Sequence, residues 1–304
     1  MKPRSTMRLA ALELVLAQLV FAAPAPAQDA DPPAMVYDRE RGELSPGTAA
    51  PKREQMLNAI KSAGATRLQA TLEYGERVEC FECIPALADK LLGSSDPRVR
   101  EIAAWWLRRR TFGIGKVMRQ MQSVAREDSD PVRRARAAAA LGEFLDPHAA
   151  PVLAELAERD ADEAVRAEAV RALGRLNVPA GHTGLSAGLR DRASSVRLAA
   201  LQQLTRINFF HDPDVLLSLL ADPDEAVRRS AVQLAGELRL VAATDVVLGI
   251  LVTDDSARVR QAAAFSAGRL GGADAARLLA DAAESERDPG VLDAIAVARR
   301  LTAR

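Results

Sequence analysis

The chain has 304 residues, of which 27% are charged and 48% apolar, and its formal net charge at pH 7 is zero. This balance argues against non-specific nucleic-acid binding, which depends on a basic surface. Only 4% of the residues are aromatic whereas alanine is abundant, so the composition favours closely packed helices over a core of large side chains.

The first 27 residues have the three-part pattern of a secretory signal peptide. A basic segment precedes a mostly apolar run that is short for a membrane span, and Ala25-Pro26-Ala27 follows as a cleavage site. Glu13 interrupts the apolar run, so an uncleaved anchor stays open as the alternative. We expect cleavage after Ala27, a mature chain of net charge −2 without a membrane span, and a periplasmic or secreted location.

Two segments precede the main part of the chain. Residues 28–52 contain four prolines and few large apolar residues, a composition that predicts a disordered, proline-rich spacer. Residues 53–83 contain two helical segments, REQMLNAIKSA and RLQATLEYG, that do not follow the later repeat. We interpret them as an N-terminal helical cap.

Cys80 and Cys83, the two cysteines of the chain, have the spacing C-x-x-C. Zinc needs about four ligands, and c-type haem attachment needs a histidine where Ile84 stands. Three neighbouring glutamates should raise the thiol pKa values, which argues against a thioredoxin-like dithiol. A structural disulfide is favoured because residues three apart in a helical turn lie close together and exported compartments are oxidising. Redox sensing by the pair stays open.

From residue 84 to residue 304 the sequence repeats with a period near 32 residues. One anchor position recurs at Leu107, Leu141, Leu173, Leu204, Ala235 and Ala267. Such a period is typical of a solenoid of stacked helix pairs. The second helix of each repeat follows a turn rich in Asp, Pro and Ser, which supplies N-caps. The sequence therefore predicts an all-α fold, an α-solenoid of about seven helix pairs.

An alanine and an arginine recur in the second helices. The alanine fits where neighbouring helices touch. The arginines are Arg100, Arg134, Arg166, Arg197, Arg228 and Arg260. They form either a structural ladder, in which each guanidinium bridges to the aspartate and turn carbonyls of an adjoining repeat, or a stripe for an anionic ligand. An aspartate usually stands four residues before the arginine, which favours the ladder.

These residues resemble HEAT repeats of the phycobilisome-lyase-like subtype. The pattern D-x-x-V-R-x-x-A-x-x-A-L-G appears in residues 162–174 as DEAVRAEAVRALG, and the resemblance covers residues 84–304. It implies a right-handed stack of helix pairs whose concave face is lined by the second helices. Families of this kind mostly act as scaffolds or binding surfaces.

The residues do not suggest an enzyme, a cofactor or a metal site. His148, His182 and His211 lie in three different repeats and none precedes a glutamate, so they do not match the paired His-Glu motifs of a di-iron hydroxylase of this fold. The sequence also lacks a Gly-rich phosphate loop and the G-x-S-x-G motif.

Two hypotheses for function follow. The first is a non-enzymatic exported scaffold that binds a protein partner on its concave face. Adjacent helical residues point about 100° apart, so one of Trp105 and Trp106 can be core while the other lies near the surface. The predicted partner-binding residues are Trp105, Arg109, Arg171, Gln202, Gln233 and Phe265. The alternative is a redox or metal-handling accessory factor centred on Cys80 and Cys83.

Overall fold

The computed structural model describes residues 37–38, 43–44, 50–207 and 212–302 and divides the chain into two units, Met1–Thr48 and Ala49–Arg304. In the first unit, strands β1 (Tyr37–Asp38) and β2 (Glu43–Leu44) pair antiparallel. The predicted signal peptide and most of the predicted spacer lie outside the described residues. In the part that is described, no helix is long and apolar enough to cross a membrane.

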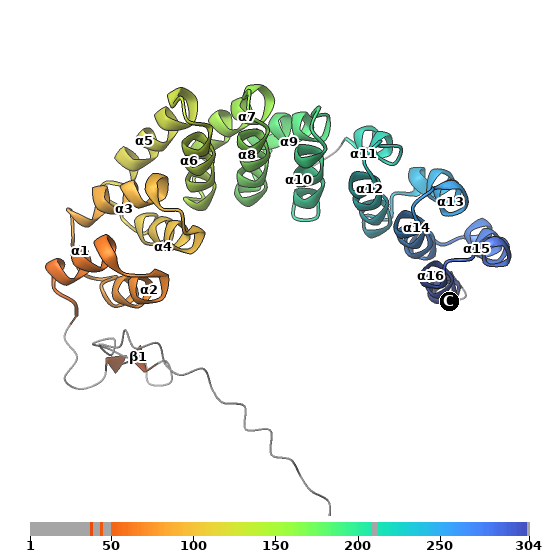
Figure 1. Cartoon of the computed structure of the whole chain (residues 1–304), viewed down its shortest axis with the longest axis horizontal. Coiled ribbons are helices and arrows are strands. Elements are labelled where there is room, and N and C mark those ends of the chain that lie inside the picture. The colour runs from red at the N-terminus through yellow and green to blue at the C-terminus, as the bar shows by residue number, and fades with distance from the viewer. Residues whose placement is uncertain (1–36, 39–42, 45–49, 208–211, 303–304) are drawn as a thin grey trace, which may run out of the picture. The chain divides into compact units, whose positions relative to one another are not determined.

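The second unit consists of helices joined in pairs by short turns (Figure 1). Its α-helices are α1 (Arg53–Ser62), α2 (Ala65–Tyr74), α3 (Cys83–Gly93), α4 (Pro97–Leu107), α5 (Ile114–Glu127), α6 (Pro131–Glu143), α7 (Ala150–Arg159), α8 (Glu163–Leu176), α9 (His182–Leu189), α10 (Ser194–Leu204), α11 (Pro213–Leu219), α12 (Glu225–Glu237), α13 (Thr244–Thr253), α14 (Ala257–Leu270), α15 (Ala273–Ser285) and α16 (Pro289–Thr302). Short 3₁₀ turns, η1 (Pro147–Ala149), η2 (Pro179–Gly181) and η3 (Val241–Ala243), precede α7, α9 and α13. The predicted α-solenoid is confirmed, with seven pairs from α3/α4 to α15/α16 and α1/α2 before them.

Within the second unit the pairs stack side by side into a curved, two-layered row (Figure 1). The second helices of the pairs line the concave side, and the first helices form the outer layer. The inner helices meet through alanines that are fully buried, such as Ala137, Ala169 and Ala231. The outer helices bury larger residues such as Leu153 and Val247. Because the inner helices carry small side chains where they meet, they pack closer together than the outer helices, and the row curves toward the inner layer.

The second helices begin where the sequence predicts. Asp96 and Asp130 each accept a hydrogen bond, at 2.9 Å, from the backbone N–H two residues ahead, and a proline occupies the first helical position after each. Asp162 and Asp224 cap α8 and α12 in the same way without the proline. Each cap satisfies a backbone donor that has no partner inside the helix.

A glycine near the end of the second helix decides how closely the next second helix packs. A Cβ atom on Gly142 would lie 2.8 Å from Ala172 Cα of α8, so only glycine fits without a backbone shift. Gly236 and Gly268 meet the backbone of the following second helix in this manner, and Gly174 meets the side chain of Gln203. Arg108 and Thr205 occupy this position in α4 and α10, and the pairs α4/α6 and α10/α12 pack less extensively than the others.

Candidate functional site

Arg166 shows how one rung of the arginine ladder is built. Its Nε and Nη2 donate to the two carboxylate oxygens of Asp191, at 2.6 and 2.9 Å, and its Nη1 donates to the carbonyls of Asp160 and Ala161. The two charged side chains are only 4% and 7% exposed. Burial alone would raise the pKa of Asp191, but hydrogen bonds from Arg166 and from the backbone N–H of Ala193 outweigh it and lower that pKa.

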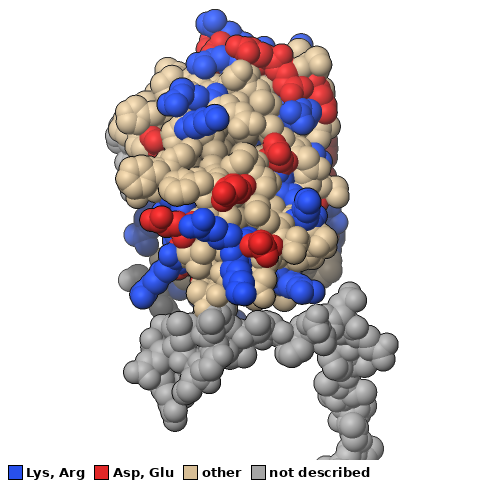
Figure 2. Space-filling view, turned by 90° about the vertical axis from the view of Figure 1, so that its left-hand side faces the viewer, with Lys and Arg blue, Asp and Glu red and all other residues tan. Residues whose placement is uncertain are grey.

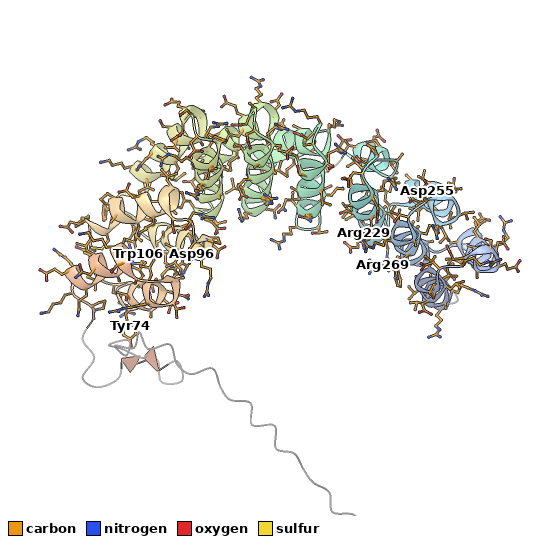
Figure 3. The ribbon with its side chains drawn as sticks, viewed as in Figure 1. Tyr74, Asp96, Trp106, Arg229, Asp255 and Arg269 are labelled. Carbon is orange, nitrogen blue, oxygen red and sulfur yellow. A yellow bond between two sulfur atoms is a disulfide. The ribbon has the colours of Figure 1, made fainter. Side chains whose placement is uncertain are left out.

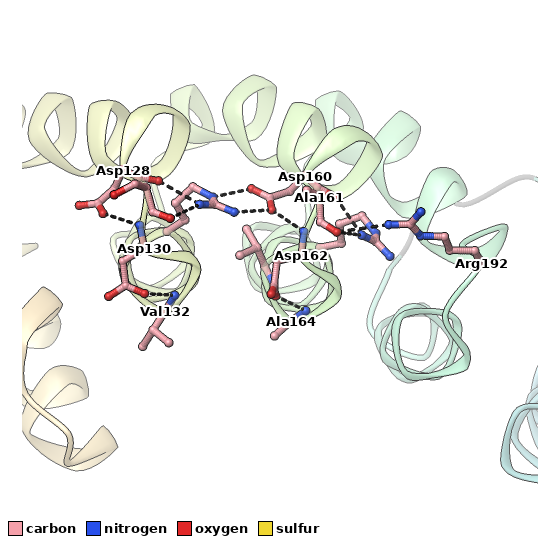
Figure 4. A network of polar contacts seen from close by, with 12 residues as sticks. Asp128, Asp130, Val132, Asp160, Ala161, Asp162, Ala164 and Arg192 are labelled. Carbon is pink, nitrogen blue, oxygen red and sulfur yellow. Dashed lines mark hydrogen bonds and ion pairs between the residues drawn. The ribbon is translucent and has the colours of Figure 1, made fainter.

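Each rung joins an arginine to a carboxylate of the next repeat (Figure 4). The five rungs in the described residues are Arg134–Asp160, Arg166–Asp191, Arg197–Asp222, Arg228–Asp254 and Arg260–Glu286. The carbonyl partners belong to the turn of the arginine's own repeat, not to an adjoining repeat as the sequence analysis expected. The aspartate four residues before the arginine caps the helix and does not form the rung.

Arg100, the first arginine of the series, has no carboxylate partner in the described residues, so the expectation of a sixth rung is wrong. Its Nη1 donates to the carbonyls of Ser94 and Ser95, at 2.8 and 3.1 Å, as in the other repeats. Asp128, which stands at the place of the rung carboxylates, instead accepts a hydrogen bond of 2.7 Å from Arg133 Nε. The Nε and Nη2 groups of Arg100 therefore keep unused donors, as far as the described part of the chain goes.

A groove of about 560 Å³ opens between α4, α6 and α8 beside Arg100. Its floor is α6, which presents the small side chains of Ala135 and Ala139; at the position of Ala139 the neighbouring second helices α4 and α8 carry Trp105 and Arg171. Residues of α4 and α8, among them Glu168 and Arg175, form its walls. Figure 1 shows that α4 runs in a different direction from α6 and α8, which run side by side, so the groove lies where the row changes direction.

The other arginines of the groove are already paired. Arg175 contacts Glu143 and Glu168 at 3.1 and 3.2 Å. Arg136 Nη1 donates to the carbonyl of Leu92 at 2.7 Å. Arg136, like Arg100, has no carboxylate partner in the described residues, but of the three arginines that line the groove only Arg100 stands at a ladder position, where the other repeats supply a carboxylate.

The predicted partner-binding residues form a row along the concave side and not one compact site. Trp105, Arg171, Gln202, Gln233 and Phe265 each stand five residues after the ladder arginine of their own second helix. They extend over five repeat intervals, from α4 to α14, and the corresponding position of α6 holds Ala139. Gln202 and Gln233 are exposed, and Phe265 is 40% exposed. The row offers contacts of different chemistry to an elongated surface.

The two tryptophans differ as the helical geometry predicts. Trp106 is buried, whereas Trp105 is half-buried at the concave side. The guanidinium of Arg109 lies 4.4 Å from the centre of the Trp105 ring, a cation–π contact that joins two predicted binding residues. Arg110 stacks on Trp106 at 3.7 Å, where burial lowers the pKa of Arg110.

Two features of the concave side were missed by sequence reasoning. The first is the groove floor, because Ala139 replaces the large residue of the row and an alanine gives no sign of a binding site. Its only sequence signal is the run of alanines at residues 137–140. The second is formed by Arg229 of α12 and Arg269 of α14, which Figure 3 places on the inner side of the curve.

Cys83 begins α3, and Cys80 lies in the segment just before that helix. Their sulfur atoms are bonded at 2.01 Å, and both residues are buried. The described residues hold no cluster of His, Cys, Asp and Glu suited to a metal ion. His148 Nδ1 contacts Asp146 at 2.7 Å, His182 begins α9, and His211 lies outside the described residues.

Charges of both signs are mixed on the surface beside the first helix pairs. Figure 2 shows Lys and Arg interspersed with Asp and Glu on this face. A continuous basic patch of the kind that follows a nucleic-acid backbone is not seen on this face.

Comparisons with known proteins identify the repeat. The family model for HEAT repeats matches residues 118–205 and 213–299, more than half of the chain. The solved structure of Escherichia coli YibA is 17% identical with a TM-score of 0.55, and the match covers 84% of this chain and 93% of that one. At this identity the likeness shows the fold alone.

Two further solved structures are less similar. An archaeal HEAT-like repeats protein from Thermococcus onnurineus NA1 is 17% identical with a TM-score of 0.47, covering 72% of this chain and 97% of that one. Human deoxyhypusine hydroxylase is 18% identical with a TM-score of 0.35, covering 73% and 96%. A search of curated proteins found no match.

Proposed function

Because the chain belongs to the HEAT-repeat family, we propose that it is a non-enzymatic scaffold that binds a protein partner along its concave side. The observation that carries the proposal is the row of residues at one position of five of the six second helices from α4 to α14, which presents a tryptophan, an arginine, two glutamines and a phenylalanine to one surface. HEAT repeats typically mediate protein–protein interaction, and such a mixture of anchors suits a protein surface.

The arginine ladder supports this function by fixing the second helices in place. Each rung ties two neighbouring repeats with two hydrogen bonds between charged groups, at 2.6–3.1 Å over the five rungs. A surface held in this way loses little freedom on binding, so more of the interaction energy contributes to affinity.

The location proposed for the scaffold is outside the cytoplasm. The signal-peptide pattern of residues 1–27 and the bonded pair Cys80–Cys83 both support export to an oxidising compartment. The alternative function, a redox or metal-handling factor at this pair, requires thiols that are free for part of the time. Thiol titration of the native protein, denatured without reductant, should find none, and one equivalent or more would favour the alternative.

Affinity capture from the native envelope fraction tests the scaffold. We expect the triple variant Trp105→Ala, Arg171→Ala, Phe265→Ala to lose a partner that the wild type captures. The matched control, Arg119→Ala with Val252→Ala, changes exposed residues of the outer helices α5 and α13 and should keep the partner. Equal capture by all three proteins, or no reproducible partner for the wild type, would refute the proposal.

A further inference from the structure

We propose that the groove beside Arg100 binds an acidic side chain of an extended partner segment, which supplies the carboxylate missing from the first rung. This inference rests on the proposed function and specifies the chemistry that the partner brings. The segment carries an aspartate or glutamate flanked by small residues.

The five complete rungs show which chemical group fits the Nε and Nη2 donors of Arg100. In each of them, Nε and Nη2 of the arginine face the two oxygens of one carboxylate. The carboxylate also accepts a backbone N–H two residues ahead, as Asp160 does from Asp162 and Asp222 does from Asp224, both at 2.9 Å. The partner group is thus a carboxylate at the start of a tight turn.

Arg100 is already oriented for such a group. Its Nη1 is held by the carbonyls of Ser94 and Ser95, as the corresponding Nη1 is in the complete rungs. The carboxylate of Asp128 is committed to Arg133 through one oxygen and to the backbone N–H of Asp130 through the other. The guanidinium is therefore held through Nη1, it lines the groove, and Asp128 does not serve as its acceptor.

The groove gives an incoming segment room on the concave side. It follows α6 from Pro131 to Glu143, a length of about 20 Å at the rise of an α-helix, which six extended residues would span at roughly 3.3 Å each. The alanine floor accepts small side chains and a close backbone. The lining has four acidic residues. Glu143 and Glu168 are paired with Arg175, and Asp162 accepts backbone N–H groups as the cap of α8, so these three repel an acidic segment less than free carboxylates would, whereas Glu101 beside Arg100 is exposed.

A peptide from the chain's own ladder provides the probe. Acetyl-ADPDEA-amide reproduces residues 221–226, whose first aspartate completes the rung with Arg197. Titration of the full chain is followed by the NMR signal of Arg100 Nε–H. We expect this signal to shift on saturation, and an analogue with asparagine in place of the first aspartate to bind at least tenfold more weakly. Equal binding of both peptides, no shift of Arg100, or equally strong binding of acetate would overturn the inference.

Two variants with matched controls locate the site. Arg100→Gln removes the charge, and Ala139→Trp fills the floor with the residue that α4 carries at the same position; each should weaken the peptide at least tenfold. Arg119→Gln removes a charge from the outer helix α5, and Val297→Trp adds a ring at the corresponding exposed position of α16; neither should change binding. Thermal melts check that all four fold. Unchanged binding in Arg100→Gln would refute the site.

The outcomes also separate this inference from the scaffold itself. If the peptide fails to bind while partner capture still depends on Trp105 and Phe265, only the acidic-segment site is wrong. If the peptide binds at Arg100 while no partner is captured, the carboxylate site stands and the scaffold proposal falls.

Discussion

The contact between α6 and α8 and the contact between α4 and α6 join successive repeats of one solenoid, yet they are built differently. The α6/α8 contact has Gly142 at the close approach and a rung from Arg134 to Asp160. The α4/α6 contact has Arg108 in place of the glycine, and Arg100 lacks a carboxylate within the described residues. The first is closely packed, and the second leaves a groove.

The contact between α10 and α12 shows the effect of losing the glycine while the rung is kept. It also lacks the glycine, because Thr205 stands there, but its rung from Arg197 to Asp222 is complete at 2.7 Å. Loss of the glycine therefore accompanies looser packing of the second helices. The α4/α6 contact differs from the α10/α12 contact because it lacks the rung in addition to the glycine.

The largest expected effect comes from breaking a complete rung. Arg166→Met leaves the buried carboxylate of Asp191 without its partner and should lower the free energy of unfolding by about 3–5 kcal/mol. Arg100→Met removes only two hydrogen bonds to carbonyls and should cost about 1 kcal/mol. Denaturant unfolding measures both, and equal losses would contradict the distinction between the two contacts.

The next effect tests the close approach at the glycine. Gly142→Ala places a Cβ atom 2.7 Å from Ala172 Cβ and should destabilise the protein by about 1–3 kcal/mol, because the helices must move apart. Gly249→Ala in α13, where an added Cβ meets nothing within 4 Å, should stabilise it by about 0.5–1 kcal/mol. Thermal unfolding of the pair gives the comparison, and two shifts of the same sign would refute it.

A smaller, pH-dependent effect is expected at the last rung. The hydrogen bond from Arg260 holds the pKa of Glu286 at about 2, below its ordinary value of 4.5. A lowered pKa in the folded state stabilises the protein fully above pH 4.5, and this contribution is lost as the pH falls toward 2.

The variant Glu286→Gln removes that dependence. The difference in unfolding free energy between wild type and variant should be largest above pH 4.5 and should shrink toward pH 2. Glu284→Gln, at an exposed position outside the ladder, serves as the control. A difference that is constant with pH would contradict the assignment.

The smallest effect on stability is expected from Arg133→Gln, because Arg133 is 41% exposed. Its hydrogen bond is the main reason why the pKa of Asp128 is low, with the backbone N–H of Asp130 second. We expect that pKa to rise toward its ordinary value in the variant, as measured by NMR titration. A pKa that stays low together with loss of peptide binding would mean that Asp128 had moved to Arg100.

The features predicted correctly from the sequence are those set by nearby residues. Helix starts follow from an aspartate and the N–H two residues ahead, and the fold follows from the repeat period. The rung partners could not be identified in this way, because the carboxylate lies 25 or 26 residues after its arginine and is Glu286 in one repeat. Whether Asp128 pairs with Arg133 or with Arg100 depends on tertiary geometry. The groove could not be predicted because it results from the lack of large side chains on α6.

Because every rung joins an arginine of one repeat to an acid of the next, the pairing is directional. Each complete repeat therefore carries a donor toward its successor and an acceptor toward its predecessor. A chain of this design can gain or lose a whole repeat by duplication or deletion and still form every pairing across the new junction. The ladder thus makes the length of the solenoid, and with it the extent of the concave surface, open to evolutionary change.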